Sequence, residues 1–278
     1  MKREKLLNLG CGNVYNQKWT NVDLYKTGKN VVYADLRKKL PFKTKYFDAV
    51  YCSHILEHFE SEDAIKFGKE VYRILKPGGV IRIVVPDLEK IASLYLSKMK
   101  KAMSGDERAG YDYDWILLEL FDQTTRTKTG GKMFTYIIDP KCPNKSFVES
   151  RIGMETEHIL ETNKEKLVYR YLRVVKSRGV RWLIGYVYKI VLSGVLFLLG
   201  GKSSYQAYID GVFRNSGEIH QQMYDEYSLK RFLKSIGFRR IKRMDADKSN
   251  IHNFNDYELD TYKGKVRKPD SIFMEAVK

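Results

Sequence analysis

Short apolar runs separated by turn residues dominate the first ninety positions of the chain. Five of these runs have the length of β-strands: 5–9, 19–24, 31–34, 47–52 and 80–85. Residues 61–75 instead place apolar side chains at helical spacing, and the sequence Lys-Pro-Gly-Gly at 76–79 ends that helix. Unbroken apolar strands are typical of a parallel sheet that is covered on both faces. Strands alternating with helices therefore predict a doubly wound α/β fold.

The pattern changes after the fifth run and returns near the C-terminus. Residues 227–236 predict a helix that Gly237 ends, and two closing strands are expected at 238–244 and 271–277. Helical spacing dominates the long stretch between residues 88 and 222. We therefore expect a mostly parallel, seven-stranded sheet with an antiparallel closing strand.

This pattern divides the chain into two parts. Residues 1–87 and 223–278 would form the α/β core, and residues 88–222 would form a helical insertion or lid.

Small and acidic residues stand where the first three predicted strands end. Gly10 and Gly12 follow the first strand, and glycine lets a backbone approach a ligand closely because it has no Cβ. Asp23 ends the second strand, where a carboxylate can accept hydrogen bonds from ribose hydroxyls. Asp35 follows the third strand and is placed to receive an adenine amino group. The carboxyl ends of such strands meet at one edge of the sheet, so this order predicts a nucleoside site there.

Several stretches of the chain resemble class I (Rossmann-like) methyltransferases that depend on S-adenosylmethionine (SAM). They are LNLGCGN, NVDL, ADLRKKLPF, FDAVYCSHILEHF, EVYRILKPGG and a late GF. Within that family the chain looks closest to small bacterial enzymes associated with surface-polysaccharide synthesis, through stretches such as HQQMYDEYSLKRFLKSIGF. The resemblance implies SAM as the cofactor and O-methylation of a sugar or lipid-linked glycan as the reaction.

The resemblance also implies which residues bind the cofactor. The glycine loop would hold the amino-acid part of SAM, the acids after strands two and three would meet ribose and adenine, and residues after strand four would face the methionine end. The implied set is Asn8, Gly10, Cys11, Gly12, Asn13, Asp23, Leu24, Asp35, Leu36, Ser53 and His54.

Two features depart from the common pattern of these enzymes. Val14 stands where a third glycine is usual, and only ten residues separate Gly12 from Asp23. The first crossover helix should therefore be short or missing. A nicotinamide cofactor is disfavoured, because Tyr15 occupies the position of the third glycine in the dinucleotide-binding fingerprint.

A hydroxyl acceptor must lose a proton during methyl transfer, and histidine is the side chain best suited to accept it near neutral pH. His54 follows the fourth strand near the methyl donor, and His220 lies in the loop that returns from the insertion. We predict that one of them is the base or orients the acceptor, with a structural histidine as the alternative for each. Asp122, Gln123 and Arg126 could contact an acceptor sugar or phosphate, or form a solvated helix face.

Composition adds an expectation about partners. The formal net charge of +16 predicts an anionic partner. The three cysteines have neither disulfide nor zinc-site spacing, so we expect reduced thiols and no metal. The N-terminus lacks the apolar stretch of a signal peptide, which favours a cytoplasmic location.

Residues 163–202 are first basic and then strongly apolar. Between 183 and 201 the only charged residue is Lys189. This order is typical of a segment that binds an anionic membrane surface from the cytoplasmic side. A helix buried in the lid, a dimer interface and a transmembrane span are the alternatives, and nothing in the sequence indicates an oligomeric state.

Competing functions remain open from the sequence. The acceptor could instead be a membrane-soluble small molecule such as a quinone or lipid, or the chain could be a non-catalytic SAM-binding regulator. An RNA substrate would also account for the charge. Nucleic acid is not expected as a partner, because Cys52-Ser53-His54-Ile55 replaces the Asn/Asp-Pro-Pro-Tyr motif and no RNA-binding module is evident.

Overall fold

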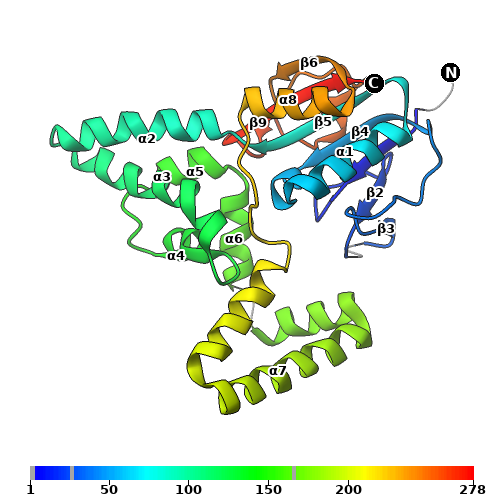
Figure 1. The fold of residues 1–278 in the computed structure, drawn as a ribbon. Coiled ribbons are helices and arrows are strands. Elements are labelled where there is room, and N and C mark those ends of the chain that lie inside the picture. Colours follow the sequence, from blue (N-terminus) through cyan, green and yellow to red (C-terminus); the bar gives the residue numbers. More distant parts are fainter. Residues whose placement is uncertain (1–3, 26–27, 165–166) are drawn as a thin grey trace.

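The computed structural model describes residues 4–25, 28–164 and 167–278, and their side chains apart from those of residues 158 and 162–182. A seven-stranded sheet forms its centre (Figure 1). The strands are β1 (Leu6–Leu9), β2 (Thr20–Asp23), β3 (Val31–Tyr33), β4 (Phe47–Ser53), β5 (Leu75–Pro86), β6 (Arg239–Met244) and β9 (Ser271–Val277).

The order of these strands is β3-β2-β1-β4-β5-β9-β6. Strands β1 to β5 pair in parallel, whereas β9 is antiparallel to both β5 and β6. The predicted fold class, a mostly parallel sheet with an antiparallel closing strand, is therefore confirmed. A small second sheet joins β7 (Thr261–Tyr262) to β8 (Lys265–Val266).

Apolar residues cover both faces of the large sheet. On one face, helices α1 (Ser61–Ile74) and α8 (Glu226–Ile236) bury Phe67, Val71 and Leu233 against the strands. Gly68 lets these two helices meet, because a Cβ at this position would lie only 2.9 Å from Ile236 Cγ1.

The opposite face of the sheet is covered by the chain between β6 and β7. The short 3-10 helix η2 (Phe254–Tyr257) packs there against Trp19 and Tyr51. Burial on both faces explains why the strands read as continuous apolar runs.

The boundaries of α8 follow from its capping residues. The Asp225 carboxylate accepts a hydrogen bond from Ser228 N, and Ser228 Oγ accepts one from Asp225 N, which forms a capping box. At the other end Gly237 has a φ of 111°, a left-handed conformation that glycine adopts without strain. The helix predicted at 227–236 is therefore confirmed within one residue.

The connection from β1 to β2 contains turns in place of a helix, as the short Gly12–Asp23 spacing predicts. The stretch from 88 to 222 is helical. Its helices are α2 (Leu88–Met103), α3 (Glu107–Thr125), α4 (Gly131–Ile138), α5 (Lys145–Ile152), α6 (Glu155–Lys164) and α7 (Leu167–Arg214). Ile91, Trp115 and Ile152 belong to a second hydrophobic core shared by these helices. The division into a core and a separate insertion stays a prediction.

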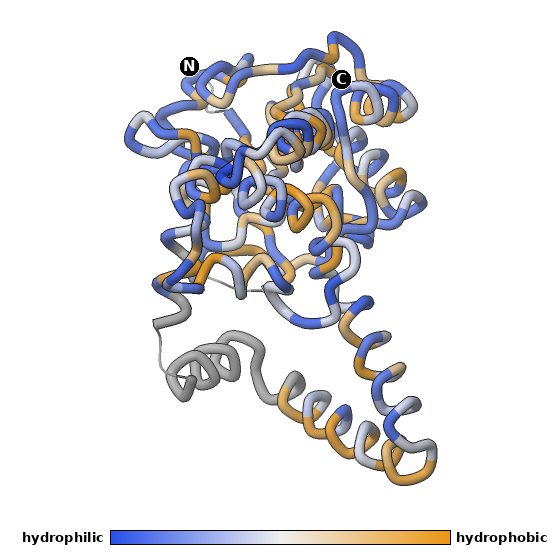
Figure 2. The backbone as a smooth tube through the Cα atoms, turned by 90° about the vertical axis from the view of Figure 1, so that its left-hand side faces the viewer, coloured by the Kyte–Doolittle hydropathy of each residue, from blue (hydrophilic) through white to orange (hydrophobic). Residues whose placement is uncertain are grey.

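Helix α7 changes direction at Gly201, in its C-terminal part. Gly201 has a φ of 69°, and Figures 1 and 2 show residues 183–199 running below the body of the protein and residues 202–214 rising back to it. We call these two segments the α7 hairpin, and residues 183–199 its outward arm. Among the described residues, Leu183–Arg214 is the one segment long and apolar enough to cross a membrane, judged by length and composition. The predicted segment 163–202 is covered only in part, because residues 165–166 and the side chains of 162–182 lie outside the described ones.

Candidate functional site

A cavity of about 540 Å³ opens at the carboxyl ends of β1, β4 and β5, within the usual size range of small-molecule sites. One wall is the loop after β1 together with the end of β4. The other wall comes from the start of α6 and the segment before β9, including Glu155 and Lys268. The predicted cofactor residues that line it are Asn8, Gly10, Cys11, Gly12, Asn13, Ser53 and His54.

The loop after β1 is shaped by two glycines with positive φ. Gly10 has a φ of 68°, and a Cβ there would lie 2.1 Å from Ile55 Cδ1, so this position requires glycine. Gly12 has a φ of 49°, and a Cβ there would meet no protein atom within 4 Å. Because Gly12 also lines the cavity, its bare backbone faces the space where a ligand would lie. This geometry fits a cofactor that contacts the loop through the backbone.

Asp23 holds this loop from the end of β2. Its Oδ2 accepts a hydrogen bond of 2.8 Å from Gly12 N, and its Oδ1 accepts one of 2.9 Å from Tyr25 N. Val22 O accepts hydrogen bonds from the backbone N–H groups of Gly10 and Cys11. The second strand therefore fixes both the loop and the carboxylate predicted to bind ribose.

The structure gives less direct support for the residues predicted to bind ribose and adenine after β2 and β3. Asp23, Leu24, Asp35 and Leu36 are outside the described lining of the cavity. Burial raises the pKa of Asp35, but the hydrogen bond and charge of Arg37 outweigh it and lower the pKa overall. Arg37 Nε lies 3.0 Å from Asp35 Oδ1, so an adenine amino group would have to share this carboxylate. Their roles stay predictions.

His54 lines the cavity and has a strained backbone conformation. Its φ is 53°, in the left-handed region that non-glycine residues rarely adopt, and such strain is concentrated at functional sites. Its Nε2 lies 2.8 Å from Ser271 Oγ, and its Nδ1 lies 3.3 Å from Glu57 Oε1. Burial, with smaller effects of Lys268 and the other two histidines nearby, lowers the pKa of His54 well below its usual value. The ring is therefore neutral at physiological pH.

His220, the other predicted base, lies beside His58 rather than on the cavity wall. It is 4% exposed, and its ring packs edge-on against that of His58 with centroids 4.7 Å apart. Burial lowers the pKa of His58 to about 4 and that of His220 to about 2, so both rings are neutral. Glu57 completes this group, and burial raises the pKa of its carboxyl to about 8.

Glu57, His58 and His220 each offer one donor atom, and these atoms lie within 4.8 Å of one another. Such a set could hold a metal ion. The cysteine spacing led us to expect no metal. The sequence feature that could have indicated a metal site is His-Ile-Leu-Glu-His at 54–58, a stretch dense in metal-binding side chains. No sequence signal connects it to His220.

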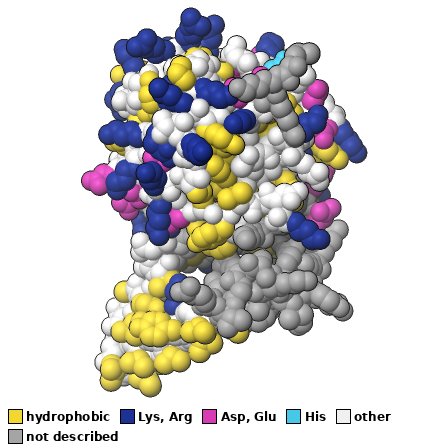
Figure 3. Space-filling model, turned by 90° about the vertical axis from the view of Figure 1, so that its right-hand side faces the viewer, with side chains coloured by type: hydrophobic (Ala, Val, Ile, Leu, Met, Phe, Trp, Pro, Cys, Tyr) yellow, Lys and Arg dark blue, Asp and Glu magenta, His cyan; other side chains and the backbone are white. Residues whose placement is uncertain are grey.

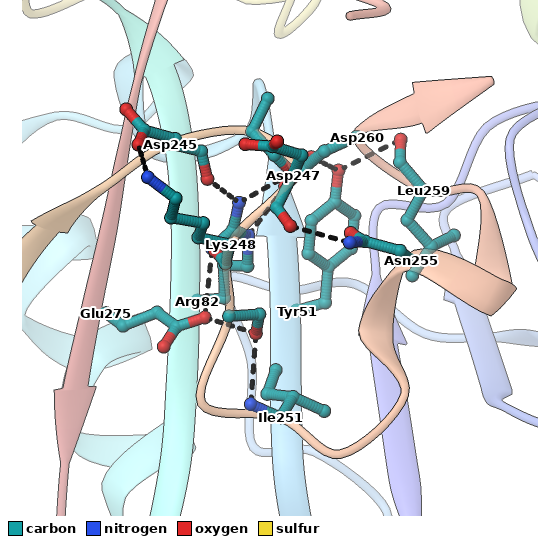
Figure 4. A network of polar contacts seen from close by, with 12 residues as sticks. Tyr51, Arg82, Asp245, Asp247, Lys248, Ile251, Asn255, Leu259, Asp260 and Glu275 are labelled. Carbon is teal, nitrogen blue, oxygen red and sulfur yellow. Dashed lines mark hydrogen bonds and ion pairs between the residues drawn. The ribbon is translucent and has the colours of Figure 1, made fainter. Parts of the chain in front are cut away.

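A buried ionic network supports the side of the cavity formed by Tyr51 and Asp260 (Figure 4). Arg82 is fully buried in β5, with Nε 2.6 Å from Asp260 Oδ2 and Nη1 2.9 Å from Glu275 Oε1. Tyr51 Oη donates a hydrogen bond of 2.6 Å to Asp260 Oδ1. Three backbone carbonyls, those of Asp245, Ala246 and Lys248, accept the remaining guanidinium hydrogens.

The polar residues predicted to contact the acceptor, Asp122, Gln123 and Arg126, make hydrogen bonds within the stretch from 88 to 222. Asp122 accepts hydrogen bonds from Lys132 N and Met133 N at the start of α4. Gln123 O accepts the N–H of His220, and Arg126 Nη2 donates 2.7 Å to Glu218 O. These contacts fasten the loop after α7 to α3 and cap α4. Asp122 and Arg126 also line a second cavity of about 640 Å³, so their contact with an acceptor stays a prediction.

Residues 17–83 match the family model of a methyltransferase domain, and this match spans β2 to β5 beside the cavity. No curated protein matches the chain. Among solved structures, a SAM dependent methyltransferase from Archaeoglobus fulgidus has 15% identity and a TM-score of 0.39, over 99% of this chain and 86% of that chain. A SAM-dependent methyltransferase from Thermotoga maritima, described as a possible histamine N-methyltransferase, has 13% identity and a TM-score of 0.37, over 100% and 84%. A SAM-dependent methyltransferase from Mesorhizobium loti has 21% identity and a TM-score of 0.24, over 31% of this chain and 50% of that chain.

Proposed function

We propose that the chain is a SAM-dependent methyltransferase, as its methyltransferase-domain match over residues 17–83 supports. We further propose that its acceptor is a hydroxyl group of a sugar or lipid-linked glycan used in cell-surface polysaccharide synthesis. The observation that carries this proposal is the cavity wall opposite the glycine loop. Glu155, Glu157 and Glu161 face the cavity together with Arg267 and Lys268. Carboxylates accept hydrogen bonds from hydroxyls, so a wall rich in them suits a polyhydroxylated acceptor.

SAM supplies an electrophilic methyl group when bound. The residues of this chain contribute position: the backbone of Gly10 and Gly12 would hold the amino-acid part, and Asp23 would hold the ribose. In-line displacement at a methyl carbon is accelerated chiefly by fixing donor and acceptor in contact.

Of the two predicted bases, His54 is the better placed to accept the hydroxyl proton or orient the acceptor, because it lines the cavity and His220 is outside the described lining. Its neutral ring keeps one lone pair, and Glu57 lies 3.3 Å from Nδ1, where a carboxyl group can orient the ring. The acceptor hydroxyl would take the place of Ser271 Oγ, which lies 2.8 Å from Nε2. A positioned base typically contributes a factor of about 10²–10⁴ to the rate.

Replacing His54 with alanine should lower kcat at least about 100-fold while SAM affinity stays within about threefold. The measurement is transfer of label from methyl-labelled SAM into the lipid-linked glycan fraction of a cell-envelope extract, with SAM binding measured separately by calorimetry. The exposed His252→Ala variant is the matched control and should retain normal turnover. Near-normal turnover of the His54 variant would remove its assigned role, and failure of the unchanged protein to label that fraction would contradict the acceptor class.

An acceptor carried by a lipid requires the enzyme to reach a membrane, and α7 supports this part of the proposal. The outward arm of the α7 hairpin exposes apolar side chains. Only 6% of the most apolar 18-residue stretch within Leu183–Arg214 is buried. At the turn Leu198 and Leu199 are 82% and 85% exposed. Figure 2 shows this apolar stretch on the outward arm, and Figure 3 shows hydrophobic side chains gathered on the part that projects below the body.

Charge favours an anionic bilayer over a second protein copy as the occupant of this surface. Residues 167–209 contain no Asp or Glu, and their basic residues are Arg170, Arg173, Lys176, Arg178, Arg181, Lys189 and Lys202. Lys202 directly follows the turn at Gly201, so the tip cannot enter the hydrocarbon deeply. We expect the outward arm to lie in the interface, with the enzyme peripheral on the cytoplasmic face of the membrane.

Replacing both Leu198 and Leu199 with aspartate should abolish co-flotation with vesicles containing phosphatidylglycerol, because two charges would then have to enter the apolar interface. The unchanged protein should float with these vesicles and bind pure phosphatidylcholine much more weakly. Met103→Asp, a change at an 80% exposed apolar residue at the end of α2, is the matched control and should float normally. Flotation that the tip variant retains, or a dimer that the tip variant dissociates, would contradict membrane docking by this hairpin.

The same hairpin favours one competing acceptor class, a membrane-soluble quinone or lipid. The labelled extract separates the two, since the methyl group would then appear in a small apolar product that contains no sugar. Binding of SAM without transfer to either fraction would instead indicate a regulatory protein.

A further inference from the structure

A cluster of three potential metal ligands lies where the end of β4 meets the loop returning from α7. Glu57 and His58 belong to the 3-10 helix η1 (Leu56–His58), and His220 comes from the returning loop. Their donor atoms lie within 4.8 Å of one another. Small side-chain adjustments would bring them around a single ion.

Two members of this cluster carry buried polar atoms that the described part of the chain leaves without a hydrogen bond. Glu57 is 0% exposed, and neither of its carboxylate oxygens makes a hydrogen bond of good geometry, the nearest ring nitrogen being His54 Nδ1 at 3.3 Å from Oε1. His220 Nδ1 is in the same condition. Unpaired polar groups in a protein interior are costly and uncommon, so a group that binds all of them at once would remove a substantial penalty.

The third member is oriented in the manner of a metal ligand. His58 Nδ1 donates a hydrogen bond of 3.2 Å to Ile219 O, which leaves Nε2 with a free lone pair. Metal-binding histidines usually donate their other N–H to a carbonyl or carboxylate in this way. The backbone that carries these three residues is also held in place, because Glu57 O accepts hydrogen bonds from Gln221 N and Gln222 N.

Two nearby cations do not occupy the cluster, since each already has an acidic partner. Arg126 donates to Glu218 O and lies 3.9 Å from the Glu218 carboxylate. Lys268 Nζ lies 3.5 Å from Glu155 Oε2. Neither cation forms an ion pair with Glu57 among the described contacts.

We propose that Glu57, His58 and His220 bind a divalent transition-metal ion of the zinc class. Two imidazoles and one carboxylate suit zinc and similar ions, whereas magnesium and calcium prefer oxygen ligands alone. The ion ties the returning loop to the end of β4 next to His54, and this role does not depend on the identity of the acceptor.

The full-length protein, stripped with a chelator and titrated with Co²⁺, tests the site without any activity assay. We expect one equivalent to produce the visible absorption of a four- or five-coordinate Co²⁺ ion. Zinc at about 100 times its dissociation constant should raise the unfolding midpoint by about 5 °C. His220→Ala should weaken Co²⁺ binding at least about 10-fold, whereas the control His252→Ala should bind normally.

Glu57→Gln distinguishes a metal ligand from a buried neutral acid. The amide has the same shape but is a poor ligand, so this variant should lose the Co²⁺ spectrum and the zinc-dependent rise in midpoint. Absence of a one-equivalent Co²⁺ spectrum in the unchanged protein would overturn the proposal. So would an unaltered zinc response in Glu57→Gln, because the carboxyl would then contribute nothing to binding.

Discussion

Replacing Arg82 with methionine is expected to lower the free energy of unfolding by about 3–5 kcal/mol. The variant removes the only side-chain cation that pairs with Asp260 and Glu275 among the described contacts, at 2.6 Å and 2.9 Å. Both carboxylates are nearly fully buried, and each would be left without its counter-charge. Breaking one partner of a buried pair is costly because the desolvation of the other is no longer offset. Urea denaturation measures the change.

A rescue variant separates this cause from a loss of packing. Adding Asp260→Asn and Glu275→Gln to Arg82→Met neutralises both orphaned charges and should recover a large part of the lost stability. Lys66→Met is the control, because its pair with Asp63 is on the surface and should contribute nothing measurable. Equal instability of the single and triple variants would show that the loss comes from packing around Arg82 and not from the charges.

Arg82 also illustrates what sequence reasoning could and could not predict. It was visible as the one polar residue inside the apolar run at 80–85, and the run alone was enough to place β5. Its partners Asp260 and Glu275 lie 178 and 193 residues further along the chain, and no local pattern connects them. Local periodicity therefore predicted the strand, while the ion network that depends on tertiary contacts was found only in the structure.

The same distinction applies to the candidate site. The glycine loop and the end of β4 could be predicted, because parallel strands bring their carboxyl ends to one edge. The opposite wall, with Glu155 and Lys268, could not be predicted, since it depends on how the helical stretch folds back over that edge. For His220 the sequence indicated a place near the core, but its packing against His58 depends on the path of the loop after α7.

The sequence predicted the apolar helix in the α7 hairpin but not the turn that follows it. An uninterrupted apolar run predicts a helix, but a pair of glycines inside it does not determine whether the helix continues or turns. In the structure Gly201 adopts a positive φ and the chain reverses there. Because the chain reverses at residue 201, polar residues follow directly after the apolar tip. This arrangement favours a segment that lies in the membrane interface over one that spans the membrane.

Asp23→Ala is expected to weaken SAM binding about 100-fold, or roughly 3 kcal/mol. A carboxylate that accepts hydrogen bonds contributes more than a neutral acceptor, about 1.5–3 kcal/mol for each bond. The substitution removes the predicted ribose acceptor. It also removes the 2.8 Å hydrogen bond from Gly12 N and the 2.9 Å bond from Tyr25 N, which hold the glycine loop. Calorimetric titration with SAM measures the loss.

Asp23→Asn separates these two contributions. Its side-chain oxygen can still accept the Gly12 N–H, although its amide nitrogen cannot accept the Tyr25 N–H. The loop after β1 should therefore keep its shape, and SAM binding should weaken only about tenfold through loss of the charge. Asp63→Ala, at a partly exposed carboxylate on α1, should bind SAM normally. Affinity within about threefold of normal in Asp23→Ala would remove Asp23 from the cofactor site. Since His54→Ala should change kcat and leave SAM affinity intact, opposite responses of these two variants would separate the residues that bind the cofactor from those that act on the acceptor.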